Sequence, residues 1–171
     1  MSRQRGTVLL MALMFMVVLS VLGIAMVSST SVEERMARNA RDQDIAMEAA
    51  EAALRDARIR VSGIYTYPET RPNSWDFADD CTNGLCSVNV TQPVWSSYSL
   101  DAAPSVALGT VTGSPTLVGV TSQPRYLVER IVIRRPGDSI TNTAGGLTAY
   151  RTTAKGVGRN SSVIIQEVVI L

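Results

Sequence analysis

The sequence of 171 residues has no histidine and only two cysteines, and aromatic residues make up 5% of it. Without histidine, a Ser-His-Asp triad, a Cys-His dyad and imidazole-based metal sites are excluded. Two cysteines alone cannot hold a structural zinc ion. The formal net charge of +1 also lacks the basic excess typical of nucleic-acid-binding domains. We therefore expect no enzyme, no cofactor or metal ion, and no nucleic-acid partner.

Charged side chains are also absent between Arg5 and Glu33, where the apolar stretch Thr7–Val27 lies. As a helix, these 21 residues would be about 32 Å long, close to the roughly 30 Å hydrocarbon thickness of a bilayer. A core helix of so small a protein is rarely apolar on all sides, so we predict a membrane span. Because Arg3 and Arg5 precede the span and Glu33 and Glu34 follow it, the positive-inside rule predicts a cytoplasmic N-terminus and an exported remainder.

A short basic leader, MSRQRG, ends in Gly6 directly before the apolar run. A Sec signal peptide has a shorter apolar region followed by small residues, whereas Gly23 and Ala25 lie within this run. The leader resembles the class III signal of type IV pilins, which a prepilin peptidase cuts after the glycine. The resemblance implies that the mature chain begins at Thr7 and keeps its apolar helix. Most pilins have a glutamate at the fifth mature position, where this sequence has Met11.

A helical pattern continues beyond the span, from Ser31 to Val61. Its apolar residues form a stripe that is expected to pack against one partner surface. The stripe consists of Met36, Ala40, Met47, Ala50, Leu54, Ala57 and Val61. The pairs Glu34–Arg38, Glu51–Arg55 and Asp56–Arg60 are expected on a solvated face, each contributing about 0.2–0.5 kcal/mol. Ser31 and Glu34 match a capping box, so the helix is either interrupted at residues 28–31 or continuous.

Residues 30–58 contain VEERMARNARDQD followed by AMEAAEAALRDAR, and this block resembles the PilX-type minor pilins. In that family the block follows the span and leads into a small β domain. The resemblance implies an α+β pilin fold, in which a long N-terminal helix packs on a small antiparallel β-sheet. It divides the chain into a leader (1–6), the transmembrane half of the helix (7–28), its periplasmic amphipathic half (29–61) and a globular β domain (62–171).

Past Val61 the composition shifts to the Gly, Pro, Ser and Thr of loops and short strands. Strands are expected at Leu85–Thr91, Tyr126–Arg134, Ala149–Val157 and Val163–Leu171. The last of these, VIIQEVVIL, is mostly apolar on both faces and is expected to be central or covered by the helix. Residues 61–124 are acidic on balance and residues 125–171 basic, which could give complementary patches for head-to-tail packing.

Cys81 and Cys86 flank the dipeptide Asn83-Gly84, whose tight turn would bring the cysteines together. Because an exported chain meets an oxidising compartment, a disulfide is favoured over free thiols. The closed loop is short, so the bridge is expected to contribute only about 2 kcal/mol and to shape a local feature. PilX-type proteins often carry a similar C…NGLC segment.

Two further motifs favour structural roles. Gly156-Val-Gly158 lies between two expected strands with no helix after it, so a hairpin turn is favoured over a nucleotide-binding loop. The aspartates between residues 76 and 101 do not match the spacing of an EF-hand loop, and a solvated loop is expected there.

These features predict a minor pilin of the inner membrane that helps to initiate pilus assembly or forms part of the pilus tip, supporting adhesion, aggregation or twitching motility. A carboxylate inside the membrane is costly unless paired. Met11 therefore suggests a position at or near the tip, where no earlier subunit's amine needs a partner. The resemblance implies other minor pilins, the major pilin, the prepilin peptidase, the inner-membrane assembly platform and a tip adhesin as partners. The alternatives are a type II secretion minor pseudopilin at the pseudopilus tip and a single-pass anchored periplasmic binding protein.

Overall fold

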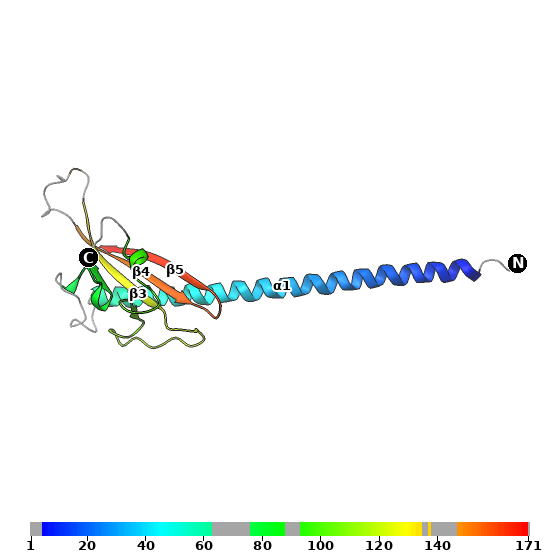
Figure 1. The fold of residues 1–171 in the computed structure, drawn as a ribbon, viewed down its shortest axis with the longest axis horizontal. Helices are drawn as coiled ribbons and strands as arrows, with labels where there is room; N and C mark the ends of the chain where they lie inside the picture. The colour runs from blue at the N-terminus through cyan, green and yellow to red at the C-terminus, as the bar shows by residue number, and fades with distance from the viewer. Residues whose placement is uncertain (1–4, 63–75, 88–92, 135–136, 138–146, 171) are drawn as a thin grey trace. The chain divides into compact units, whose positions relative to one another are not determined.

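Helix α1 (Arg5–Ser62) is the longest element of the fold (Figure 1). The computed structural model describes residues 5–62, 76–87, 93–134, 137 and 147–170. Contacts divide the chain into two units, Met1–Arg41 and Asp42–Leu171, and α1 contributes to both. The helix continues through residues 28–31, so Ser31 lies inside it and caps no new helix. Of the two alternatives that the sequence left open, the structure shows the continuous helix.

In the first unit, the part of the helix before Glu33 has an uncharged, mainly apolar sequence from Thr7 onward, and the hydroxyl groups of Ser20 and Thr30 bond to the helix backbone. The mean hydropathy of its most apolar window is 2.8, and no part of that window is buried. Ser20 Oγ donates a hydrogen bond to the Met16 carbonyl at 2.7 Å, and Thr30 Oγ1 donates to the Met26 carbonyl at 3.1 Å. Because these bonds satisfy the hydroxyls internally, the hydroxyls do not oppose burial in lipid. Within the described residues, α1 is the one helix long and apolar enough to cross a membrane.

In the second unit, α1 packs on a sheet with the strand order β1-β3-β4-β5, and β2 also pairs with β3. The strands are β1 (Leu85–Ser87), β2 (Val106–Ala107), β3 (Arg125–Ile133), β4 (Leu147–Val157) and β5 (Ser162–Ile170). All pairs are antiparallel except β1 with β3, which is parallel. The predicted α+β class with a long helix on a small sheet is confirmed, and β1 makes that sheet mixed (Figure 1).

The expected strands agree with the observed ones to within about two residues where the structure describes them. The expectations for Tyr126–Arg134, Ala149–Val157 and Val163–Leu171 correspond to β3, β4 and β5. Strand β1 covers the beginning of the expected strand Leu85–Thr91. Residues 88–91 lie outside the described part, as does Leu171.

The prediction that the last strand is central is wrong, whereas its alternative, cover by the helix, is correct in part for one face of the strand. Strand β5 is the edge of the sheet and has no fully buried residue. The side chains of Ile164 and Val168 are each 50% exposed. An apolar run looks the same in sequence whether its cover lies in the same chain or in another, which is why the pattern alone was misleading.

The helix face that packs on the sheet consists mainly of alanines. Its buried residues are Ala46, Ala49, Ala50, Ala53, Ala57 and Val61. The predicted stripe is therefore correct at Ala50, Ala57 and Val61, whereas Met36 and Met47 are 60% and 48% exposed. The buried face is rotated toward the alanines because small side chains let the helix approach the sheet closely.

The other face of the sheet is covered by the segment around the cysteines. This segment includes a single 3-10 turn (Thr82–Gly84) and the short helix α2 (Val94–Ser97). Its buried cluster consists of Cys81, Cys86, Val94, Leu100 and Leu127 of β3. The small sheet is thus covered on both faces in its middle, at β3, and is open at β5.

Candidate functional site

The expected processing site lies at the beginning of α1. Gly6 and Thr7 are within the helix, and a Cβ added at Gly6 would have no heavy atom within 4 Å. The fold therefore does not itself require a glycine at this position. Met11, at the position of the missing glutamate, is 65% exposed. Arg3 lies outside the described residues, and the structure describes the backbone but not the side chain of Arg5.

Most of the exposed large apolar side chains among the described residues lie on the membrane-length part of α1. Every large apolar side chain from Val8 to Met26 is more than half exposed. A monomeric soluble protein rarely exposes a contiguous apolar patch larger than a few hundred Å². The span must therefore be covered by lipid or by other apolar helices.

Asp42 fastens α1 to the turn between β4 and β5. Its Oδ1 accepts a hydrogen bond from the backbone N–H of Arg159 at 2.6 Å, and its Oδ2 accepts from Asn160 at 2.9 Å and Ser161 at 2.8 Å. These bonds, led by the one from Arg159, lower the pKa of the Asp42 carboxyl to about 2. Asp42 is the first residue of the second unit. The packed part of the helix thus begins at this site.

Two glycines of the Gly156-Val-Gly158 motif bring the sheet into contact with the helix backbone. A Cβ at Gly156 would lie 2.0 Å from the Ala46 carbonyl oxygen, and one at Gly158 would lie 2.6 Å from the Asp42 carbonyl oxygen. Gly156 belongs to β4 itself, so the prediction that this motif forms only a hairpin turn is incomplete. The missing side chains allow close packing of α1 on β4.

Asp56 and Arg60 hold loops to the helix and do not form the solvated pair that their spacing suggests. Both are buried, at 2% and 4% exposed. Asp56 accepts hydrogen bonds from the backbone N–H of Gly109 and from the hydroxyls of Thr112 and Ser114. Arg60 Nη1 donates to the Asn83 carbonyl at 2.9 Å. They lie on the helix face that is turned toward the loops, which the i to i+4 spacing does not reveal.

The two remaining predicted pairs have different outcomes. Arg38 Nη2 lies 2.5 Å from Glu34 Oε1, so that solvent-exposed pair is confirmed. Glu51 and Arg55 lie on an exposed helix face as expected, but among the described residues they form no ion pair.

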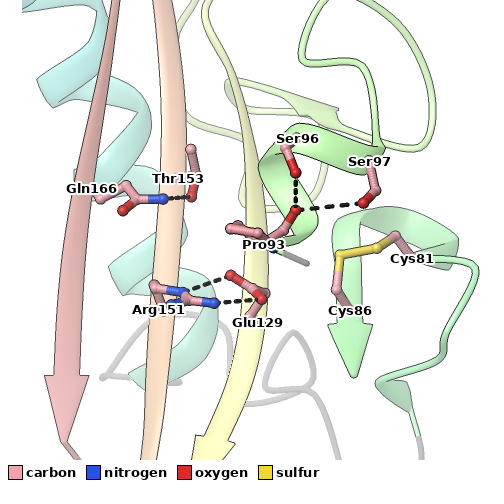
Figure 2. A network of polar contacts seen from close by, with 9 residues as sticks. All are labelled: Cys81, Cys86, Pro93, Ser96, Ser97, Glu129, Arg151, Thr153 and Gln166. Carbon is pink, nitrogen blue, oxygen red and sulfur yellow. Dashed lines mark hydrogen bonds and ion pairs between the residues drawn. A yellow bond between two sulfur atoms is a disulfide. The ribbon is translucent and has the colours of Figure 1, made fainter. Parts of the chain in front are cut away.

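On the sheet face opposite α1, an ion pair between buried Glu129 and partly exposed Arg151 lies near the disulfide (Figure 2). Glu129 accepts two hydrogen bonds from the Arg151 guanidinium, at 2.7 and 2.8 Å. These bonds raise the pKa of Arg151. Cys81 and Cys86 form a disulfide with a Cα–Cα distance of 4.1 Å, and neither residue is exposed. The bridge is thus part of the core beside β3.

The aspartates near the disulfide bond to their own surroundings. Asp80 accepts hydrogen bonds from the backbone N–H and the hydroxyl of Thr82, which lower the pKa of its carboxyl. Asp101 pairs with Lys155 of β4 at 2.6 Å. Across the described residues, no group of three or more His, Cys, Asp or Glu side chains is arranged to hold a metal ion.

A membrane-length apolar helix that continues into an amphipathic half packed on a small sheet defines the pilin class of proteins. The family profile described as PilX N-terminal matches residues 5–55. The profile described as type IV pilus assembly protein PilX C-term matches residues 38–171. The chain therefore belongs to the PilX family of type IV pilus minor pilins. Searches of curated proteins and of solved structures found no significant match.

Proposed function

We propose that this minor pilin helps to initiate pilus assembly or forms part of the pilus tip complex. In this proposal, the prepilin peptidase cuts after Gly6, and the mature chain begins at Thr7. The span stays in the inner membrane with its N-terminus cytoplasmic, and the β domain is periplasmic until assembly brings the subunit to the cell surface. The family match to a type IV pilus protein favours this role over the secretion pseudopilin and the anchored binding protein.

The observation that carries the proposal is the uninterrupted apolar surface of α1, including Met11. Before assembly, lipid covers this surface, and afterwards the helices of neighbouring subunits cover it. Extraction without such cover would expose the whole span to water, so extraction and assembly must be coupled. A carboxylate at position 11 would need a partner amine inside the membrane. This chain has Met11 at that position, which fits a subunit that enters the filament before any neighbouring subunit has an N-terminal amine to be neutralised.

In this role, the partners are other minor pilins, the major pilin, the inner-membrane assembly platform and a tip adhesin. The contacts with other pilins would be made first through α1, because most of the exposed large apolar side chains among the described residues lie on it. In this role, the protein would influence adhesion, aggregation and twitching by setting how many pili are initiated.

Two measurements test the proposal. Mass spectrometry of the membrane-inserted protein should give a mature N-terminus at Thr7, and Gly6→Val should leave Met1 in place. An epitope tag at the C-terminus, detected with gold particles, should label one end of each pilus. An intact Met1 in the wild-type protein would refute processing, and label spaced evenly along the shafts would refute the tip position.

A further inference from the structure

Strand β5 presents an unpaired edge with none of the usual protection. Its other edge pairs with β4 over the strand's whole length, and no strand in the described part of the chain pairs with its free edge. Edge strands are usually protected by short length, proline, a bulge or outward-facing charges. β5 has nine residues and a regular register. Its one charged side chain, Glu167, is turned toward α1 and bonds to Arg58.

The side chains of β5 are left half covered on both of its faces. On the face opposite α1, Ile164, Val168 and Ile170 are 50%, 50% and 53% exposed. On the face toward α1, Ile165 and Val169 are only partly buried. A further strand beside β5 would extend both faces and cover these side chains, as well as pairing the free N–H and C=O groups.

A groove between α1 and β5 runs beside this edge. It is lined by Glu51, Leu54, Arg55 and Arg58 of α1 and by Gln166 and Glu167 of β5. Arg58 and Glu167 neutralise each other. Glu51 and Arg55 carry opposite charges, and neither has an ion pair or a side-chain hydrogen bond with any described residue. The groove therefore offers an apolar floor at Leu54 and one unpaired charge of each sign.

We propose that the free edge of β5 takes up an extended segment of another protein of the assembly complex, which joins the sheet as an additional strand. Main-chain hydrogen bonds to β5 supply the attachment, and alternate side chains supply the specificity. On one face, the segment carries apolar side chains that continue the row of Ile164, Val168 and Ile170. On the other face, it places an acidic group near Arg55 and a basic group near Glu51. The choice of a partner from the complex rests on the proposed function.

The size of the edge favours such a partner over a second copy of this chain. One added strand along nine residues covers a band roughly 30 Å long and 5 Å wide. A stable free-standing interface covers about 800 Å² on each partner. The edge alone is therefore too small to hold two copies together. Its occupant must be kept beside β5 by further contacts, which components of one membrane-bound complex provide.

Site-specific photo-crosslinking of the full-length protein in cells tests the proposal. A benzophenone amino acid is placed in turn at positions 164, 166, 168 and 170, all on one face of β5. The matched control is position 132, because Val132 is 51% exposed but lies on β3, away from the free edge. We expect one shared adduct from the β5 positions and its absence from position 132. Successive β5 positions should attach to sites two residues apart in a single segment of the partner.

Other outcomes of this experiment would overturn the proposal. These are adducts that map to a partner helix, adducts scattered over several proteins, adducts between two copies of this chain, and the absence of any adduct specific to β5. If no β5 adduct forms in cells whose pili carry the tag label at one end, the added strand is refuted and the tip position is not. If the label is spread along the shafts while the β5 adducts still attach two residues apart in one partner segment, the tip position is refuted and the added strand is not.

Two substitutions test the chemistry of the edge and the groove. Arg55→Glu should abolish the adduct formed at position 168, and Arg55→Lys should retain it, because the groove needs a cation there. Val168→Lys should abolish the adducts formed at positions 164 and 166, because a charge is placed in the apolar row. Both positions are exposed, so the thermal unfolding midpoint of each variant should match that of the wild type. Unchanged adducts in Arg55→Glu would show that the groove takes no part.

Discussion

Replacing Gly156 with alanine should separate the helix from the sheet. The new Cβ would lie 2.0 Å from the carbonyl oxygen of Ala46 and 2.4 Å from the backbone nitrogen of Ala50. Close carbon–oxygen contacts in proteins are about 3.3–3.6 Å, so α1 would have to move away by more than 1 Å. Both contacting atoms belong to the helix backbone, and no side-chain rotation can relieve the clash.

The size of the effect follows from what that movement uncovers. Five alanines of α1 are buried against the sheet and its loops, and each buried methyl group is worth about 0.8 kcal/mol. A gap of 0.5–1 Å removes a quarter to a half of the contact energy, or roughly 1–2 kcal/mol over the five side chains. Strain from overpacking adds about 1 kcal/mol or more. We expect Gly156→Ala to lower the free energy of unfolding by about 2–3 kcal/mol.

Urea unfolding of the full-length protein in a non-ionic detergent, followed by tryptophan fluorescence, measures this change. Gly119→Ala is the matched control. Its backbone has a positive φ of 89°, but a Cβ there meets no heavy atom within 4 Å, so it should cost only about 1 kcal/mol of backbone strain. If Gly156→Ala unfolds within experimental error of the wild type, or costs less than Gly119→Ala, the helix is not held against the sheet as closely as the structure shows.

Three further predictions concern the polar and covalent ties. The pKa of Asp42 is lowered to about 2. Its stabilising effect should therefore be complete above about pH 4 and lost as the pH falls toward 2, so the urea midpoints of wild type and Asp42→Asn should converge in that range. Arg151→Ala should lower the free energy of unfolding by about 3 kcal/mol because it leaves buried Glu129 unpaired, and Arg151→Leu with Glu129→Leu should cost less. The disulfide of Cys81 and Cys86 is fully buried. Mass spectrometry after alkylation should thus detect reduction by dithiothreitol only as fast as the domain opens, and rapid reduction in native buffer would contradict this burial.

The apolar run and the spacing of the helical block predicted most of the architecture because both patterns depend only on residues that are close together in the sequence. A long run without charge can be stable only in lipid or against other apolar surfaces. The same local patterns failed where the outcome depended on distant partners. Asp56 and Arg60 matched a surface pair in spacing, yet loops that lie far along the chain bury them.

The closest contacts of the helix left weaker signals in the sequence. Asp42 lies in a run of charged and amide residues and looks solvated, although it binds three consecutive backbone N–H groups more than 100 residues away. The residues next to Asp42 in the sequence do not indicate that role. Gly156 and Gly158 did stand out, but their spacing fits both a turn and a close approach of another backbone. Two glycines at alternate positions of a strand lie on the same face, and that feature could have favoured contact with the helix.

Ion pairs within the molecule weaken the idea that the acidic and basic halves of the chain attract neighbouring subunits. Lys155 of the basic half pairs with Asp101 of the acidic half inside one molecule. Glu129 and Arg151 pair with each other, and Glu167 pairs with Arg58 of α1. These charges therefore partly neutralise one another within the molecule and contribute less to the long-range electrostatic steering of neighbouring subunits. The uncovered surfaces of β5 and of α1 between Thr7 and Met26 are instead mainly apolar, so burial of apolar area is the larger driving force for assembly. It follows that pilus assembly by this subunit should depend only weakly on ionic strength, because salt screens charges but does not weaken apolar contacts.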